Sequence, residues 1–232
     1  NNACNFNTLA TDDNGECIYP LEGFNCQGDA VTYVPDDNFE QALINLGHDD
    51  VLDDFVLTNN ISGLYNLNVE FQNISDLTGI EDFESLMSLY CGYNNLSELN
   101  LGTHPYFDYL SCSANNLSSI NIANCVSMTH LDCFNNILTE LDVSNNIMLD
   151  YIECNNNNIV QIDVSNLNGL LHLFIDNNNL NELDVSSNLY LSDLHCYNNN
   201  LSCVQVSSIE YAIQQESCPW VPCFQKDENT IW

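Results

Sequence analysis

The chain has 232 residues, one basic side chain against 33 Asp and Glu residues, and a formal net charge of −32. Because contacts with nucleic-acid phosphates or anionic lipid need lysine and arginine, this charge excludes both kinds of partner. Phosphoryl transfer is disfavoured for the same reason, since it depends on a cationic clamp. Apolar residues make up 45% of the chain, which is typical of a folded protein, and no stretch approaches the ~20 apolar residues of a membrane-spanning helix.

Residues 1–30 are predicted to form a small acidic module bounded by cysteines. Carboxylate and amide oxygens, the ligands that calcium prefers, surround a glycine turn there: Asp12, Asp13, Asn14 and Glu16. Their spacing departs from that of an EF-hand loop, so a turn that needs no ion is the alternative. The fold requires no cofactor on either interpretation. If the turn binds an ion, its oxygen ligands indicate calcium. The segment from Cys4 to Cys17 resembles short modules of bacterial surface proteins, including cargo of the type IX secretion route.

Residues 31–60 are predicted to form a helical N-terminal cap. Asp37 and Glu40 have the spacing of a capping box at the start of a helix. Phe39 and Leu43 begin its apolar stripe, which continues through Ile44 and Leu46, and Gly47 supplies the stop signal. We expect this helix to cover the first strand of the region that follows.

Internal repetition dominates residues 61–206. From Cys91, cysteine recurs every 21 residues as far as Cys154, and after Ile175 it returns at Cys196. Leucine or isoleucine stands two residues before and five residues after each of these positions, and the alternation Leu89-x-Cys91 suits a short strand. One unit cannot bury its apolar side alone, so successive units must stack. A column of asparagines is predicted to satisfy backbone groups at the turns: Asn94, Asn115, Asn136, Asn157, Asn178 and Asn199.

This pattern, LxxLxCxxNxL, resembles the leucine-rich repeat family, and in particular its 21-residue subclass in secreted bacterial proteins. The earlier unit around Leu67 and Val69 is spaced by 22 residues and resembles an internalin-type repeat. The resemblance implies a leucine-rich repeat solenoid with parallel strands stacked on the concave side. The second half-repeat carries no long helical pattern, so we expect a short extended or 3₁₀ outer side, low curvature and caps at both ends.

The twelve cysteines fall into two sets. Six occupy core positions of the repeats and are interpreted as reduced, apolar groups, because stacked neighbours ~4.8 Å apart lie too far apart for a disulfide: Cys91, Cys112, Cys125, Cys133, Cys154 and Cys196. The other six lie near the ends, where disulfides are typical of an extracellular protein: Cys4, Cys17, Cys26, Cys203, Cys218 and Cys223. Three at each end leave one thiol over, and their connectivity is open. Residues 207–232 are predicted to form the C-terminal cap.

Side chains between the core positions of the strands are predicted to face the concave side. Aromatic rings beside acidic groups there form a candidate recognition surface: Tyr90, Tyr93, Tyr109, His130, Asp132, Phe134, Tyr151, Glu153, His172, Phe174, His195 and Tyr197. An exposed face without a partner is the alternative. His130, Asp132 and Glu153 together suggest a weaker hypothesis, a metal site. We expect no catalytic residues, because a flat sheet offers no deep pocket that excludes water.

Two functions fit these observations. The first is an extracellular or cell-surface, non-enzymatic module that binds a surface protein or a glycan through its concave face. The second is a structural subunit of an extracellular fibre, or a spacer in a long adhesin, in which disulfides chain copies end to end. Neither nucleic acid nor direct membrane insertion is expected.

Overall fold

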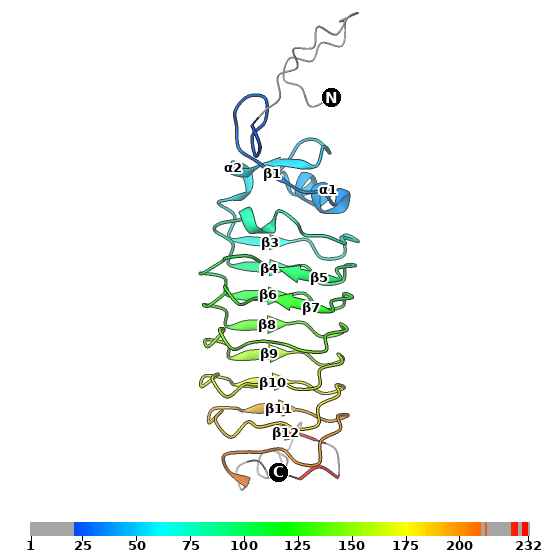
Figure 1. Cartoon of the computed structure of the whole chain (residues 1–232), viewed down its shortest axis with the longest axis vertical. Helices are drawn as coiled ribbons and strands as arrows, with labels where there is room; N and C mark the ends of the chain where they lie inside the picture. Colours follow the sequence, from blue (N-terminus) through cyan, green and yellow to red (C-terminus); the bar gives the residue numbers. More distant parts are fainter. Residues whose placement is uncertain (1–20, 210–211, 213–223, 227–228, 232) are drawn as a thin grey trace, which may run out of the picture.

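The computed structural model describes residues 21–209, 212, 224–226 and 229–231. It is a solenoid in which short parallel strands lie one above the other along a nearly straight axis (Figure 1). Eight of these strands form one sheet, in the order β12-β11-β10-β9-β8-β6-β4-β3. Their bounds are β3 Asn66–Asn68, β4 Ser88–Tyr90, β6 Tyr109–Ser111, β8 His130–Asp132, β9 Tyr151–Glu153, β10 His172–Phe174, β11 Asp193–His195 and β12 Phe224–Gln225. The leucine-rich repeat architecture predicted from the sequence is confirmed.

The repeat spacing sets the register of this sheet. Leu89 pairs with Leu67 before it and with Leu110 after it, and the same in-phase pairing continues to β11. In this sheet, the central residue of each strand from β3 to β11 is buried in one continuous apolar core. Because neighbouring side chains along a strand point to opposite faces, the first and last residue of each three-residue strand face outward.

The outer side of the solenoid is extended, as expected. β5 (Glu98–Asn100) and β7 (Ser119–Asn121) form a second, parallel two-stranded sheet there. An isolated bridge between Asp184 and Gln205 lies at the equivalent position of later units. A single 3₁₀ turn, η1 (Ile80–Asp82), occupies the outer side of the first unit.

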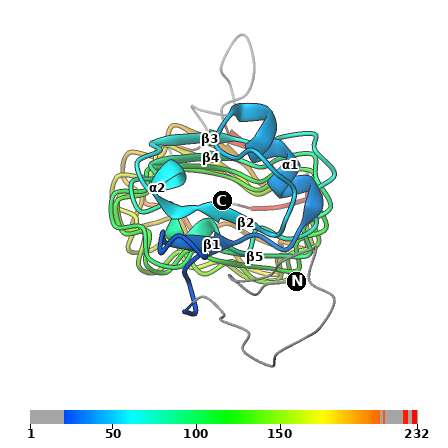
Figure 2. The same ribbon diagram turned by 90° about the horizontal axis from the view of Figure 1, so that it is seen from above.

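The N-terminal cap consists of an antiparallel pair of strands and two helices. β1 (Val31–Tyr33) pairs with β2 (Phe55–Leu57), and α1 (Asp37–Leu46) and α2 (Thr58–Ile61) flank them (Figure 2). α1 packs on the first unit through Phe39, whose ring lies 6.2 Å from that of Phe83. Gly47 ends α1 in the left-handed conformation, as the sequence predicted. Leu46 does not belong to the buried stripe, since its side chain is exposed.

The helix cap differs from the predicted capping box. Asp36, not Asp37, caps α1: its Oδ1 accepts hydrogen bonds from the backbone of Asn38 and Phe39. Its Oδ2 accepts further bonds from the backbone and hydroxyl of Ser75 in the first unit. These bonds lower the pKa of Asp36 in spite of its partial burial, which acts in the opposite direction. The same carboxylate therefore begins the helix and ties the cap to the solenoid.

The cysteines of the repeats lie in the core, as interpreted from the sequence. All six are fully buried thiols: Cys91, Cys112, Cys125, Cys133, Cys154 and Cys196. Burial in apolar surroundings raises the pKa of Cys112 and Cys133 well above the ordinary thiol value. They therefore behave as small apolar side chains rather than as nucleophiles.

The six cysteines near the ends of the chain, which were predicted to form disulfides, differ in their bonding state. Cys203 is an exposed, free thiol, so the disulfide predicted for it is not present. It lies where the chain pairs with Ile231 through an isolated bridge. Cys26 is disulfide-bonded. Four of the predicted disulfide residues lie outside the described part of the chain: Cys4, Cys17, Cys218 and Cys223.

Candidate binding surface

The outward surface of the eight-stranded sheet, which we call the concave face, carries two columns of side chains. The first residue of each strand contributes to one column, and the strand register aligns them: Ser88, Tyr109, His130, Tyr151, His172 and Asp193. The last residue of each strand contributes to the other: Tyr90, Ser111, Asp132, Glu153, Phe174 and His195. The concave face is therefore built by the repeat itself, because equivalent positions in successive units meet across the sheet.

Aromatic rings stack across consecutive strands of this face. Strands ~4.8 Å apart hold equivalent side chains at stacking distance, and the centroid separations are 4.6 Å for Tyr109 and His130 and 3.9 Å for His130 and Tyr151. Phe174 and His195 continue the series with an edge contact at 4.7 Å. We call the whole series the ring ladder: Tyr90, Tyr109, His130, Tyr151, His172, Phe174, His195 and Tyr197.

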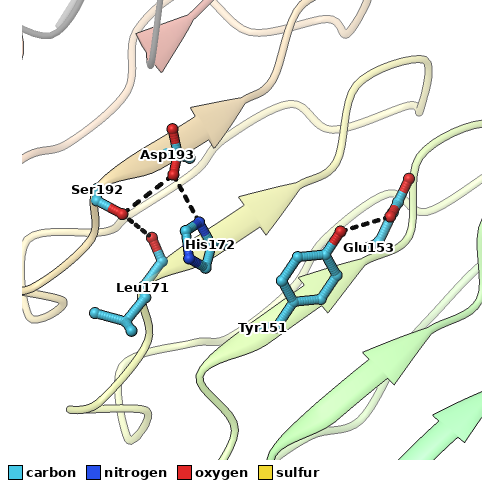
Figure 3. Close-up of polar contacts among 6 residues, drawn as sticks. All are labelled: Tyr151, Glu153, Leu171, His172, Ser192 and Asp193. Atoms are coloured by element: carbon cyan, nitrogen blue, oxygen red, sulfur yellow. Dashed lines mark hydrogen bonds and ion pairs between the residues drawn. The ribbon is translucent and has the colours of Figure 1, made fainter.

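Polar contacts fix several members of the ring ladder (Figure 3). The hydroxyl of Tyr151 donates a hydrogen bond of 2.7 Å to Oε2 of Glu153 on the same strand. Nδ1 of His172 lies 2.6 Å from Oδ2 of Asp193 on the next strand. Ser192 donates to the backbone oxygen of Leu171 at 3.0 Å and so holds the start of β11 against β10. These contacts hold the side chains of Tyr151 and His172 in fixed orientations.

Asp132 and Glu153 occupy neighbouring positions in the second column. Oδ2 of Asp132 accepts hydrogen bonds from Ser111 at 3.0 Å and from Ser113 at 3.4 Å. Its Oδ1 is buried and has no hydrogen-bond partner among the described residues. Burial, opposed by the Ser111 bond and reinforced by the like charge of Glu153, raises the pKa of Asp132 to about 6. Oδ1 of Asp132 therefore lies below the surface of the face and is closed to solvent.

Burial favours the neutral form of four ring side chains of the face. Burial lowers the pKa of His130 and of His195, so both imidazoles are neutral at neutral pH. Burial, the Glu153 hydrogen bond and nearby carboxylates raise the pKa of Tyr151, and burial also raises that of Tyr109. Since the sequence contains one Lys and no Arg, the charge of the concave face at neutral pH comes from its carboxylates.

Two predicted residues lie beyond the strand ends. Phe134 follows β8 and is half-buried. Tyr93 follows β4, is 48% exposed, and stacks on Phe71 at 4.4 Å. Phe71, 64% exposed, was missed by the sequence analysis, although the 22-residue spacing of the first unit places it in the column of Tyr93.

The Phe71–Tyr93 pair has an unfavourable backbone. Both residues have positive φ, 59° and 56°, a region that bulky side chains rarely occupy. Equivalent positions in four later units carry asparagine, which tolerates this conformation: Asn135, Asn156, Asn177 and Asn198. Because the two rings are exposed, they do not stabilise the core and so do not offset the strain of their backbone. A strained residue that does not serve the core is a candidate for a functional role.

The proposed metal sites receive no support from the geometry. His130, Asp132 and Glu153 do not bring three ligand atoms together; within the described residues the one such group is Asp37, Glu40 and Asp54. The carboxylate of Glu40 already accepts bonds from the backbone of residues 53–55, which is a structural role. The four residues of the predicted calcium turn lie outside the described part of the chain: Asp12, Asp13, Asn14 and Glu16.

Two hollows among the described residues lie on the outer side of the solenoid, away from the ring ladder. One is lined by Leu99 and Gly102 among others, and the other by Ile120, Ile162 and Leu183 among others. Both are shallow and rimmed by acidic side chains. They offer no enclosed space next to the titratable groups of the concave face.

Comparisons with known proteins agree with the fold. No protein-family model matches the chain, and no curated protein matches it in sequence. Among solved structures, internalin C2 from Listeria monocytogenes is similar over 73% of this chain and 87% of its own, with 19% identity and a TM-score of 0.52. The LRIM1/APL1C complex is similar over 64% of this chain and 30% of that chain, with 20% identity and a TM-score of 0.55.

A further similar structure is the functional domain of InlJ from Listeria monocytogenes, which is described as including a cysteine ladder. It is 25% identical over 76% of this chain, and its TM-score is 0.43. This chain spans 52% of that domain.

The fold is therefore a leucine-rich repeat solenoid of the kind found in internalins. Folds of this class commonly mediate protein binding and generally serve as interaction modules rather than as enzymes. In the part of the chain that the structure describes, every helix is too short or too polar to cross a membrane.

Proposed function

We propose that the chain is an extracellular, non-enzymatic binding module that takes a surface protein or a glycan on its concave face. The observation that carries this proposal is the ring ladder. Its rings come from successive units, contacts with neighbouring rings fix their orientation, and they are half-exposed on the outward side of the sheet. Rigid aromatic surface of this kind supplies most of the binding energy in many interfaces, at a small loss of conformational entropy.

The extracellular setting has separate support. Cys26 is disulfide-bonded, and stable disulfides are typical of secreted and surface proteins. A chain with a net charge of −32 suits surroundings that contain salt, because 0.1 M salt screens the repulsion between exposed charges that lie more than ~10 Å apart. The resemblance of residues 4–17 to modules of exported bacterial proteins points the same way.

The double variant Tyr109→Ala/Tyr151→Ala tests the concave face. Binding to candidate host cells or to a glycan array is expected to fall by about tenfold or more, the loss typical of two hot-spot side chains. The matched control is Tyr106→Ala/Tyr190→Ala, which removes two exposed tyrosines from the loops that precede β6 and β11. Equal binding by both variants would count against a concave site.

A second function, the fibre subunit, is favoured by one observation. Cys203 is an exposed, free thiol close to the end of the solenoid, and such a group is available for bonding to another copy. Non-reducing gels of oxidised protein are expected to show dimers that are absent from the Cys203→Ser variant. Purely monomeric wild-type protein under these conditions would argue against covalent assembly.

A further inference from the structure

We infer that the edge of the concave face carries a sugar subsite, in which an uncharged pyranose ring of a glycan stacks on Tyr93 over Ala114 and bonds to the amide of Asn135. This inference rests on the proposed function and deepens it, because it names a glycan as the partner and gives the place of one sugar ring. It depends on an open ring face, on a missing member in a column of side chains and on a strained backbone.

Tyr93 has one covered and one open ring face. It belongs to a column of equivalent positions with positive φ, which we call the left-handed column: Phe71, Tyr93, Ala114, Asn135, Asn156, Asn177 and Asn198. One face of Tyr93 stacks on Phe71 of the preceding unit, with an angle of 12° between the ring planes. The other face is directed toward Ala114, because successive units repeat along the solenoid axis. Tyr93 is 48% exposed, whereas Tyr109 of the ring ladder has a ring against each face.

The small side chain of Ala114 leaves room for one ring beside Tyr93. Backbone hydrogen bonds of 2.9 Å, from Tyr93 to Ser113 and from Ala114 to Phe134, continue the parallel stacking at this point of the chain. Two units at ~4.8 Å each therefore separate the backbone of Tyr93 from that of Asn135 by ~9.6 Å. A ring that contacts Tyr93 on one face and Asn135 on the other, at ~3.5–4.0 Å each, needs ~7–8 Å. One ring fits, and a second does not.

The backbone gives separate support for a function at this position. The φ angles of Phe71, Tyr93 and Ala114 are 59°, 56° and 53°, where asparagine is tolerated better than any of the three. Both rings are exposed, so burial in the core does not offset this strain. Two stacked rings followed by a small side chain thus occur in successive units in spite of their conformational cost, as is typical of a functional site.

The polar groups beside the open face favour a sugar. The side chain of Asn135 is exposed and forms no hydrogen bond within the described residues, whereas Asn198 donates to Asn177 at 2.8 Å. A free amide both donates and accepts, as a sugar hydroxyl does. The C–H groups on the face of a pyranose pack against the negative face of an aromatic ring.

Other occupants match these groups less well. A proline or an aromatic side chain of a polypeptide would fill the same space but would offer the amide of Asn135 no partner. Sialylated or sulfated sugars are repelled by a chain with a net charge of −32. An uncharged pyranose ring satisfies the ring face, the amide and the charge together.

The test begins with an array of neutral oligosaccharides and their sialylated counterparts, probed with the whole chain. The wild-type protein is expected to bind at least one neutral oligosaccharide more tightly than its sialylated counterpart, and that neutral compound is then titrated by calorimetry. Tyr93→Asn removes the ring and is expected to lower the affinity at least about tenfold. Ala114→Asn keeps the ring but places a side chain over its open face, so a similar loss is expected.

Both variants place asparagine at a positive φ, so neither is expected to be less stable than wild type in urea unfolding. A loss of binding in a protein of equal or higher stability then belongs to the surface. The matched controls Tyr190→Asn and Thr139→Asn change exposed residues outside the left-handed column and are expected to alter the affinity by less than about twofold.

Four results would overturn the inference. They are failure of the wild-type protein to bind any neutral oligosaccharide, tighter binding of the sialylated forms, unchanged affinity in Tyr93→Asn or Ala114→Asn, and losses of the same size in the controls. Displacement of the sugar by a polyproline peptide of higher affinity would also contradict it, since the partner would then be a polypeptide.

The proposed function and this inference fail in different ways. If Tyr109→Ala/Tyr151→Ala loses binding to cells while Tyr93→Asn and Ala114→Asn keep the wild-type affinity for the sugar, the concave face binds elsewhere and only this inference is wrong. If Tyr93→Asn and Ala114→Asn lose the sugar while Tyr109→Ala/Tyr151→Ala binds cells and sugar normally, the subsite stands and the ring ladder is not the binding surface. If all of these variants bind as wild type does, both proposals are wrong.

Discussion

The side-chain amide of Asn136 donates hydrogen bonds to the backbone oxygen of Cys112, one turn earlier, at 3.2 Å, and to that of Cys133 in its own turn at 3.1 Å. Its Oδ1 accepts a bond of 2.9 Å from the backbone of Leu117. Equivalent bonds made by the neighbouring asparagines, such as Asn115 and Asn157, repeat this arrangement along the solenoid. One buried amide thus supplies hydrogen bonds to backbone groups of two successive turns.

The variant Asn136→Asp tests this arrangement. The change keeps the shape of the side chain but replaces two donors by a carboxylate oxygen that faces the carbonyls of Cys112 and Cys133. We expect the free energy of unfolding to fall by about 3 kcal/mol at neutral pH, since buried carbonyls lose their donors and a charge is buried. Urea unfolding followed by circular dichroism measures it. The control Asn116→Asp adds the same charge at an exposed position; similar losses in both variants would contradict the structural role.

Much of the architecture was predictable because the repeat fixes it. The recurrence at Cys91, Cys112 and Cys133 places each strand, sets its register and decides which side chains face outward, since all units obey the same stacking geometry. The positions of Tyr109, His130 and Tyr151 on one face followed from the alternation of a three-residue strand.

Other features depend on contacts that no local pattern encodes. Asp36 and Asp37 are both adequate caps, and the choice between them is made by Ser75, which lies 39 residues further along the chain. The hydroxyls of Ser111 and Ser113 both donate to Oδ2 of Asp132, and the sequence does not show that neither of them reaches Oδ1. Phe71 was missed because the first unit has a different length, so the 21-residue column did not reach it.

The raised pKa of Asp132 predicts a pH-dependent cost in stability. Its folded value of about 6 lies above the ordinary value of 3.8, so the folded state favours the protonated form. This contribution to stability is fully present below about pH 4 and is lost as the pH rises through 6. We therefore expect Asp132→Asn to raise the free energy of unfolding at pH 8 by about 1–2 kcal/mol, after allowance for solvent screening.

Unfolding curves at pH 8 and pH 4 check this prediction, because the gain from Asp132→Asn is expected to vanish at the lower pH. Asp142 provides the control. It lies on the outer side, and the Ser144 hydrogen bonds lower its pKa, so Asp142→Asn is not expected to stabilise the protein at pH 8. A gain at both pH values for Asp132→Asn would show that the carboxylate charge is not the cause.

The backbone at Ala114 offers a stabilising change. Ala114 has φ of 53°, in the column where later units carry Asn135 and Asn156. Because asparagine tolerates the left-handed region better than alanine does, Ala114→Asn is expected to raise the free energy of unfolding by about 0.5–1 kcal/mol. Urea midpoints measure this. The control Thr139→Asn, at an exposed site outside that column, is expected to leave stability unchanged, and an equal gain there would point to a general effect of asparagine.

His104 predicts sensitivity to acid. It is 1% exposed, and neither ring nitrogen has a hydrogen-bond partner among the described residues. Burial lowers its pKa below the ordinary value of 6.5, and the nearby backbone of Ile80 and the negative charge of Glu81 act in the opposite direction. The neutral ring is therefore favoured in the folded state, and the stability that it contributes above pH 6.5 is lost as the pH falls through the folded pKa.

The repeat shows how to remove this sensitivity. Asn146 and Asn188 occupy the equivalent position in later units, and each donates to two backbone oxygens of the preceding unit. His104→Asn places the same donors opposite Ile80 and Phe83. We expect its stability at pH 7.5 to stay within about 1 kcal/mol of wild type, with a smaller loss between pH 7.5 and pH 5. The reciprocal Asn146→His is expected to lose about 2 kcal/mol through its two hydrogen bonds and to become more acid-sensitive. If His104→Asn unfolds with the wild-type pH dependence, the buried imidazole is not the group that responds to acid, because every other titratable side chain is unchanged in that variant.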